Sequence, residues 1–317
     1  MEYTNKQLNS YVNRIKLTQE QKSSYENQID NLKDNVLEAV NGMENTKVTK
    51  VRRAGSWKKG TALAPKGDYP IDIDMVFFLD LEEDTSFDAE ELRDEIINVL
   101  CKAYPNKKKS DFTDGQKTIG VVFKGSGLEA DIVPFIPEGC NTTFGGQPRK
   151  KLNSGEFKTS VDKQLDFISG IKSKCSNFTS IVRILKSWRN YKELELSSFS
   201  IELMVAHLIE RGVISDNSMN QSIVFFFEFL GSGNSVEIYF SGAIGPQAGD
   251  VPWIADPTNN ENNAINLSDG EWDEVVEAAE DGFETISYAQ IVEEKEKTLK
   301  LWKEVFGPSF SIQEQRQ

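Results

Sequence analysis

The feature that most constrains this chain is the strand-like run from position 71 to position 79, in which two aspartates alternate with apolar residues before the run becomes apolar throughout. The odd positions are all apolar, as expected for the face of a β-strand that packs against a core: Ile71, Ile73, Met75, Phe77 and Leu79. The opposite face begins with Asp72 and Asp74. A carboxylate on an otherwise apolar strand is costly unless it is paired or binds a cation, so we expect these two aspartates to have a partner.

A second acidic strand is predicted downstream, as one arm of a β-hairpin. Two strand-like segments within residues 117–135 flank a Lys-Gly-Ser-Gly turn, and Asp131 lies among apolar residues of the second segment. If this strand is a neighbour of the first acidic strand, the carboxylates of Asp72, Asp74 and Asp131 converge. Three converging acids can hold two divalent cations, which stabilise the attacking and leaving oxygens of a phosphoryl displacement.

A glycine turn precedes the first acidic strand. Gly55 and Ser56 open the segment Gly-Ser-Trp-Lys-Lys-Gly-Thr. Glycine allows a backbone to approach a phosphate closely, consecutive turn N–H groups can bind an anion, and the serine adds a hydroxyl donor. The order Gly-Ser, Asp-x-Asp and then a single Asp is more specific for phosphoryl chemistry than any of these motifs alone.

The composition argues against several classes of function. The chain has 317 residues, a net charge of −14, three scattered cysteines and a single histidine, His207. A zinc cluster or a Ser-His-Asp triad is therefore not expected. The negative charge disfavours nonspecific coating of nucleic acid. No apolar run approaches the ~20 residues of a membrane helix, and the N-terminus lacks an apolar signal core, so we expect no membrane association and a cytoplasmic location.

The remaining pattern predicts helices before and after a small sheet. A capping box at Thr18 and Gln21 begins a long amphipathic helix that ends near Gly42. Further helices are expected at residues 87–104, 178–188, 199–211, 221–230, 271–280 and 286–305. We therefore expect an α+β fold in two domains, with residues 1–155 forming the N-terminal helix and catalytic core and residues 156–317 forming a helical domain.

Three motifs carry a resemblance to a known superfamily: Gly55–Thr61, Asp72–Met75 and Asp131–Phe135. With them the sequence resembles the polymerase-beta-type nucleotidyltransferases. It is most similar to the branch that holds cyclic GMP-AMP synthase, oligoadenylate synthetase and the CD-NTases of bacterial CBASS anti-phage systems. This narrower resemblance depends on the long helix before the Gly-Ser turn and on later motifs: Leu185–Arg189, Leu196–Glu202, Asp256-Pro257 and Asn262-Asn263.

The resemblance implies a polymerase-beta-like nucleotidyltransferase core, a small mixed sheet with helices, and a C-terminal helical domain, with the long N-terminal helix bridging the two. It also implies that Asp72, Asp74 and Asp131 are catalytic and bind two Mg²⁺ ions, for which Mn²⁺ can substitute. No Cys/His insertion follows the catalytic sheet, so DNA binding through a zinc thumb is not expected.

Five further residues would contact the nucleotide by the same resemblance. Gly55 and Ser56 would hold the triphosphate, Lys186 would reach its β- and γ-phosphates, and Ser198 would donate a hydrogen bond to them. Phe199 would stack on a base. From the residues alone, Lys186 lies on the polar side of an amphipathic helix, where a solvated lysine is the alternative, and Phe199 could equally be a core residue.

The function implied is a Mg²⁺-dependent synthesis of a cyclic di- or trinucleotide second messenger from NTPs in anti-phage defence. A ribose hydroxyl would attack the α-phosphate and pyrophosphate would leave. The expected partners are ATP, with GTP as a second candidate, an effector that binds the cyclic product, and an activating or conjugating protein. Two alternatives stay open: an enzyme that extends RNA or oligonucleotides to a linear product, and a catalytically silent nucleotide-binding module.

Overall fold

The structure is a computed structural model whose described residues are 1–43, 46–66, 70–81, 89–114, 118–137, 149–150, 156–157, 161–232, 236–240, 252–258, 260–264 and 266–313. The chain divides into two compact units. Leu17–Leu165 form the sheet unit, and Met1–Lys16 together with Asp166–Gln317 form the helical unit. The predicted boundary after residue 155 lies outside the described residues.

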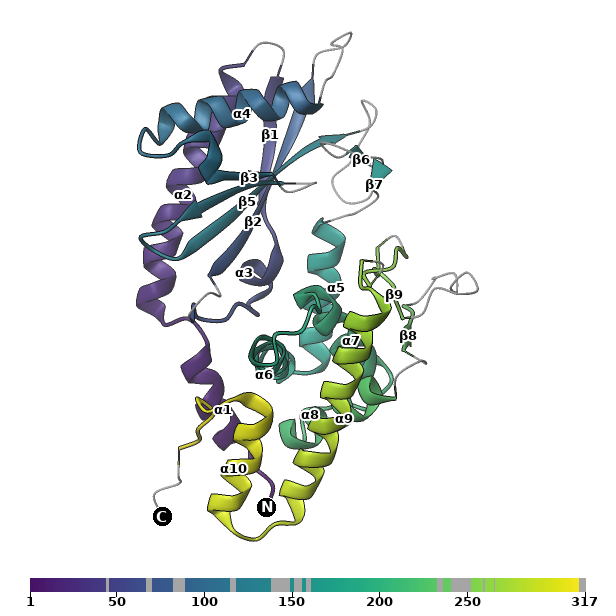
Figure 1. The fold of residues 1–317 in the computed structure, drawn as a ribbon. Coiled ribbons are helices and arrows are strands. Elements are labelled where there is room, and N and C mark those ends of the chain that lie inside the picture. Colours follow the sequence, from purple (N-terminus) through teal and green to yellow (C-terminus); the bar gives the residue numbers. More distant parts are fainter. Residues whose placement is uncertain are drawn as a thin grey trace. The chain divides into compact units, whose positions relative to one another are not determined.

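The sheet unit is built on a mixed sheet in the order β1-β2-β5-β4-β3 (Figure 1). Off this order, β6 pairs with the last two residues of β5, and β7 pairs with β6. Its strands are β1 (Thr46–Arg53), β2 (Ile71–Leu81), β3 (Phe112–Asp114), β4 (Ile119–Phe123), β5 (Leu128–Pro137), β6 (Arg149–Lys150) and β7 (Glu156–Phe157). Its helices are α2 (Gln19–Asn41), α3 (Gly55–Lys59), α4 (Ala89–Ala103) and the 3-10 turn η1 (Lys109–Asp111). Helix α5 (Val161–Lys174) begins in this unit and ends in the other.

One face of the sheet is covered by α2 and α4 (Figure 1). The predicted capping box begins α2, because the Thr18 hydroxyl accepts from the Gln21 N–H and the Gln21 side chain accepts from the Thr18 N–H. The apolar face of α2 packs onto the buried odd positions of β2, which include Ile73 and Met75. The alternation read from the sequence thus fixes which face of β2 enters the core.

The opposite face of the sheet carries the even positions of β2. A small apolar cluster of Ala54, Val76 and Phe78 lies there, with Val133 and Val161 packed against it. The first turn of α5 is held at this face by Asp162, whose carboxylate pairs with Lys50 at 2.8 Å and with Arg52 at 3.0 Å. On β2 this cluster begins directly after the two aspartates, at Val76 and Phe78.

The described buried apolar residues of the helical unit form one large core. Its helices are α1 (Asn5–Ile15), the end of α5, α6 (Phe178–Tyr191), α7 (Ser198–Glu210), α8 (Met219–Gly231), α9 (Asp269–Ile291) and α10 (Lys295–Phe306), with short strands β8 (Glu237–Ile238) and β9 (Trp253–Ile254). The fully buried Trp302 of α10 stacks on Phe306 and Phe310. The aromatic cluster ties the C-terminal segment to the N-terminal one, since Tyr3 also contacts Trp302.

Two features of the helical unit differ from the sequence prediction. Helix α1 was not expected, although a capping box of Thr4 and Gln7 begins it and Leu8 is fully buried. The expected gap between residues 280 and 286 is helical, and the break falls after Ile291 instead. Gly282 lies within α9, and its bare backbone packs against the Phe227 ring, where a Cβ would lie 3.2 Å from the ring atoms.

No helix among the described residues is both long enough and apolar enough to span a bilayer.

Candidate active site

Strands β2 and β5 are hydrogen-bonded neighbours, which meets the condition for the predicted aspartates to converge. The two strands run parallel, with Asp74 in register with Asp131 and Asp72 in register with Glu129. Neighbouring strands lie about 4.8 Å apart, and side chains in register leave the same face of the sheet. The three predicted aspartates therefore share one face, and Glu129 adds a fourth carboxylate to it.

Burial differs among the three aspartates. Asp72 is exposed, whereas Asp74 and Asp131 are half-buried. Burial raises the pKa of Asp131, and a hydrogen bond from Thr118 opposes that rise. Thr118 belongs to the site although no sequence pattern marked it. A half-buried carboxylate of this kind gains most from a nearby cation, because its ionised form is poorly hydrated.

Gly55 lies directly against Asp74. Its φ of +60° is in the left-handed region, and a Cβ at this position would lie 1.6 Å from Oδ2 of Asp74. The neighbouring Ala54 N–H donates to the Asp74 backbone oxygen at 2.8 Å, which joins this segment to β2 at the level of the aspartate. Glycine is required here on two counts, since a side chain would strain the backbone and collide with the carboxylate.

The segment that begins at Gly55 forms the short helix α3 instead of the glycine-bearing turn expected from the sequence. Ser56 is half-buried, and its carbonyl accepts from the N–H groups of Thr61 at 2.9 Å and Ala62 at 3.2 Å. The Trp57 ring packs edge-on against Tyr25 of α2 at 6.3 Å. The Gly-Ser segment is thus held by backbone hydrogen bonds and by the core, beside the acidic face.

The donor set of this face suits a hard divalent cation, because it consists of carboxylate oxygens on adjacent strands. Within the part of the chain that the structure describes, no three His, Cys, Asp or Glu side chains are gathered closely enough to hold a metal ion. Bare carboxylates repel one another, so their side chains separate even where the backbone places them side by side. The strand register is therefore compatible with a metal site whose carboxylate side chains would come together when a cation binds.

The other predicted nucleotide contacts belong to the helical unit. Lys186 of α6 is buried, with 5% of its surface exposed, although an ammonium group usually stays in water. One turn earlier on the same helix, burial lowers the pKa of the Arg183 guanidinium. The burial of Lys186 excludes the interpretation of this residue as a solvated surface lysine.

Ser198 and Phe199 form the first turn of α7. The preceding Ser197 caps the helix by accepting from the Ser200 N–H at 2.9 Å, which leaves the Ser198 hydroxyl outside the cap. A guanidinium N–H of Arg189 donates to that hydroxyl at 3.4 Å. Phe199 is half-buried and packs against the core of the unit, so part of its ring surface remains accessible.

The Asp-Pro motif of the C-terminal half organises a loop. Asp256 is buried, and its carboxylate accepts from the N–H and the hydroxyl of Thr258, both at 2.7 Å. The Asn262 side-chain oxygen accepts from the Ile254 N–H at 2.9 Å. These hydrogen bonds satisfy backbone and side-chain donors within the loop.

The predicted site residues fall into two groups. One group lies on the acidic face of the sheet unit: Gly55, Ser56, Asp72, Asp74 and Asp131. The other lies on α6 and α7 of the helical unit: Lys186, Ser198 and Phe199. A mixed sheet with a Gly-Ser segment against in-register aspartates, joined to a helical unit, is the architecture of a polymerase-beta-type nucleotidyltransferase.

The chain belongs to the family described as the Second Messenger Oligonucleotide or Dinucleotide Synthetase (SMODS) domain, which it matches over residues 1–160. It is 31% identical over 270 residues to a cyclic AMP-AMP-AMP synthase of Escherichia coli strain MS 115-1, covering 81% of this chain and 82% of that protein. It is 29% identical over 318 residues to the CBASS oligonucleotide cyclase CdnC of E. coli strain KTE188, covering 99% of both.

Solved structures of CdnC from E. coli MS115-1 share the fold. The structure with ATP has a TM-score of 0.79 and 26% sequence identity, and the alignment covers 98% of this chain and 99% of that chain. The complex of the same protein with HORMA-deltaN also gives a TM-score of 0.79, at 25% identity and the same coverage. The chain is therefore an enzyme of the nucleotidyltransferase class and a CD-NTase of the CBASS type, as the sequence predicted. This family generally uses divalent metal ions.

Proposed function

We propose that this chain joins NTPs into a cyclic di- or trinucleotide second messenger on the acidic face of β2 and β5. The observation that carries the proposal is the register of Asp74 with Asp131 and the close approach of Gly55 to Asp74. Such an arrangement places a backbone segment able to bind phosphate next to two carboxylates. The CdnC structure with ATP supports ATP as a substrate, and GTP is the second candidate.

The metal site would consist of Asp72, Asp74 and Asp131, which together would hold two Mg²⁺ ions or two Mn²⁺ ions in their place. The bound ions would lower the pKa of the attacking ribose hydroxyl and neutralise charge on the leaving pyrophosphate. Burial raises the pKa of Asp131, so this carboxylate would be suited to accept the proton of that hydroxyl. A bond forms between the ribose oxygen and the α-phosphorus, and the bond from that phosphorus to pyrophosphate breaks.

The remaining residues would bind and orient the nucleotide. The Gly55-Ser56 segment would receive the triphosphate, because its glycine leaves room beside Asp74 and its serine carries a donor. Lys186 and the Ser198 hydroxyl would contact the β- and γ-phosphates, and Phe199 would stack on a base. Catalysis of this kind depends mainly on positioning and charge, since phosphoryl transfer requires little covalent chemistry from the protein.

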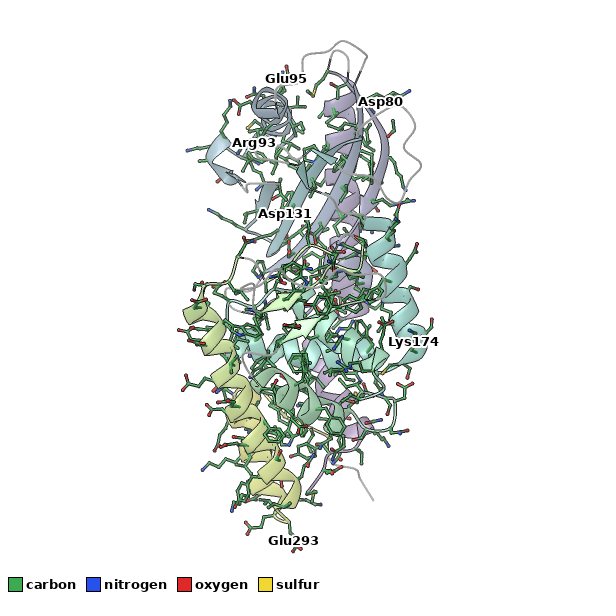
Figure 2. The ribbon with its side chains drawn as sticks, turned by 90° about the vertical axis from the view of Figure 1, so that its right-hand side faces the viewer. Asp80, Arg93, Glu95, Asp131, Lys174 and Glu293 are labelled. Carbon is green, nitrogen blue, oxygen red and sulfur yellow. The ribbon has the colours of Figure 1, made fainter. Side chains whose placement is uncertain are left out.

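The experiment that tests this function is the incubation of the chain with labelled ATP and GTP and Mg²⁺, followed by phosphatase and mass spectrometry. A phosphatase-resistant product with the mass of a cyclic di- or trinucleotide is expected. Asp74→Ala should abolish it. Asp80→Ala is the matched control, because Asp80 is an exposed aspartate farther along the same strand (Figure 2). A product from Asp74→Ala at the wild-type rate would contradict the proposal.

The partners proposed are an effector that reads the cyclic product and a protein that activates the enzyme, with all of them acting in the cytoplasm. The complex of CdnC with HORMA-deltaN supports a HORMA-type partner. Affinity purification of the tagged chain from cells that carry its neighbouring genes should recover such a protein. Product yield that does not change when the purified partner is added would exclude an activating role for it.

A further inference from the structure

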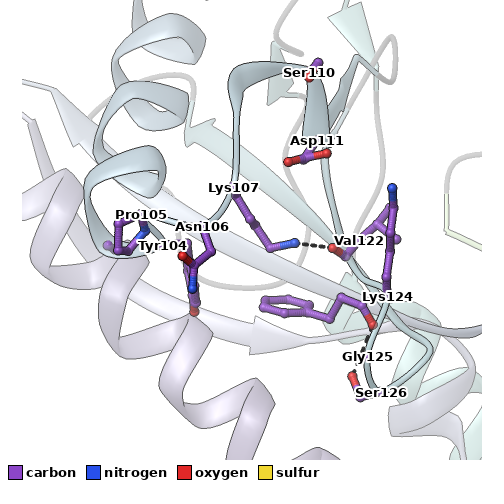
Figure 3. Close-up of a pocket in the computed structure, with 12 residues that line it drawn as sticks. Tyr104, Pro105, Asn106, Lys107, Ser110, Asp111, Val122, Lys124, Gly125 and Ser126 are labelled. Carbon is purple, nitrogen blue, oxygen red and sulfur yellow. Dashed lines mark hydrogen bonds between the residues drawn. The ribbon is translucent and has the colours of Figure 1, made fainter.

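A pocket of about 890 Å³ lies within the sheet unit, and none of the proposed site residues lines it. It is formed where the end of α4 and the segment leading to η1 face the turn between β4 and β5 (Figure 3). Its lining includes two lysines, two aromatic rings, one carboxylate and a turn hydroxyl: Lys107, Lys124, Tyr104, Phe123, Asp111 and Ser126. Pockets of ~300–1,000 Å³ are the usual size for small-molecule sites.

The aromatic wall of the pocket belongs to the face of the sheet opposite to the catalytic aspartates. Phe123 is in register with Leu128, which is fully buried in the core beneath α2 and α4. Asp131 is in register with Gly120, an odd number of residues away along β4, so its side chain leaves the other face. The pocket is therefore a separate feature from the proposed metal site.

The two lining lysines are placed differently. Lys107 is half-buried, its ammonium donates to the Val122 carbonyl, and it lies 4.7 Å from the centre of the Phe123 ring. Lys124 rises from the turn and is exposed (Figure 3). The Lys107 ammonium is thus held against the aromatic wall, and it has further N–H groups that can donate to a ligand. The exposed Lys124 side chain can move to meet the same ligand.

The charge of this region is opposite to that of the chain. Residues 102–111 together with position 124 contain five lysines and one aspartate, a formal charge of +4, whereas the whole chain carries −14. The positive field reaches into the pocket. The pKa of Asp111 is lowered, first by a hydrogen bond from the Lys108 N–H and then by the charges of Lys124 and Lys107. An anion in the pocket would relieve the repulsion among these lysines.

We propose that this pocket binds the oligophosphate group of a small anion, either free pyrophosphate or triphosphate or a nucleoside triphosphate. Ammonium groups on two sides of a concavity match a compact group with several negative charges. A nucleic-acid duplex is less suited, because its phosphates are spread along a helix and need an extended basic surface instead of a pocket.

Isothermal titration calorimetry of the full chain with sodium triphosphate in EDTA tests this proposal. Removing divalent ions weakens phosphate binding at the proposed catalytic site, so the remaining heat reports on the pocket. The wild type should bind triphosphate, and Lys124→Glu should weaken the affinity at least tenfold. Lys300→Glu is the matched control, since Lys300 is an exposed lysine on α10, and its affinity should equal that of the wild type.

Further variants keep the result interpretable. Lys124 is exposed, so Lys124→Glu should keep the melting temperature of the wild type, and Lys107→Gln should also weaken binding at least tenfold. Triphosphate that fails to bind the wild type, or that binds Lys124→Glu as tightly as the wild type, would overturn the proposal.

Two additional ligands separate the sources of the phosphate group. ATP that binds with the affinity of triphosphate identifies a site for phosphate alone, whereas ATP that binds at least tenfold more tightly identifies a nucleotide site. A short DNA duplex is the third arm. A duplex that binds through Lys124 while triphosphate does not bind would replace the small-anion assignment with a nucleic-acid one.

Discussion

The sheet unit and the helical unit place their functional residues in different ways. In the sheet unit, Asp74 and Asp131 are distant in sequence and are brought together by the hydrogen-bonded register of β2 and β5. In the helical unit, Lys186 and Ser198 are close in sequence and lie on consecutive helices. A strand register determines both the neighbour and the face of a side chain, so a motif on a strand carries more structural information than the same residues on a helix.

The two units also differ in what their site residues do for stability. The acidic face of the sheet unit holds carboxylates that repel one another, which lowers stability in the absence of a cation. The helical unit surrounds its candidate residues with a large core that contains fully buried rings such as Trp188 and Trp302. We therefore expect substitutions on the acidic face to affect activity far more than stability.

The largest effect is expected for Asp131→Asn. Asparagine has nearly the same shape as aspartate but lacks the carboxylate that is proposed to bind the metal. Turnover should fall about 10³-fold, because metal-assisted charge stabilisation contributes several kcal/mol. Since burial raises the pKa of Asp131, its ionised form destabilises the fold at neutral pH. The melting temperature in EDTA should therefore stay the same or rise. A large loss of stability in this variant would contradict the expectation that the acidic face contributes to activity far more than to stability.

Gly55→Ala comes next, with turnover expected to fall about 100-fold. The new methyl group would meet the Asp74 carboxylate, and the left-handed backbone costs about 1–2 kcal/mol for a residue with a Cβ. Gly212→Ala separates these causes, because Gly212 has a φ of +72° with open space around it. Differential scanning calorimetry should show destabilisation of both variants, with the larger loss in Gly55→Ala, while turnover assays should show full activity in Gly212→Ala. Equal loss of turnover in both would mean that strain alone is responsible.

Lys186→Ala tests the helical unit and should have a smaller effect on turnover. Loss of one charge-assisted contact to phosphate is worth about 1.5–3 kcal/mol, so kcat/KM for ATP should fall about 10- to 100-fold. Steady-state kinetics with ATP measure this directly, and Lys300→Ala should leave the value unchanged. An unaltered kcat/KM in Lys186→Ala would contradict the proposed contact of Lys186 with the phosphates and would leave Ser198 and Phe199 as the proposed contacts of the helical unit.

The smallest effect concerns a structural carboxylate of the helical unit. The pKa of Asp216 is lowered, first by hydrogen bonds from the N–H of Asn177 and from Ser176 at the start of α6. A lowered carboxyl pKa contributes stability that is present above the unfolded-state value of about 3.9 and is lost as pH falls through the folded-state value. Asp216→Asn should melt slightly below the wild type at pH 7, with the difference closing under acidic conditions. A difference that widened as the pH fell would reverse this assignment.

Much of the fold was predictable because its signals are local. The alternation around Asp72 and Asp74 identified β2 and its buried face, and the capping box at Thr18 identified the start of α2. The same kind of capping box at Thr4 begins α1, so that helix could have been recognised from the sequence. The break after Ile291 could not, because residues 286–305 contain neither a glycine nor a proline to mark it.

The site was predictable to the extent that strand patterns define it. The sequence indicated that Asp72, Asp74 and Asp131 share a function if their strands are neighbours, and the register confirmed that the strands are. It could not indicate that Gly55 touches Asp74, nor that Thr118 donates to Asp131, because those contacts arise from the packing of segments with no periodic signal.

The most direct test of the central claim is anomalous X-ray diffraction from crystals of the chain grown with Mn²⁺ and a nonhydrolysable ATP analogue. The account predicts two manganese peaks about 4 Å apart. Carboxylate oxygens of Asp72, Asp74 and Asp131 should coordinate them, with the triphosphate beside Gly55. Manganese bound elsewhere, or a nucleotide bound with Asp131 outside the coordination of both ions, would contradict it.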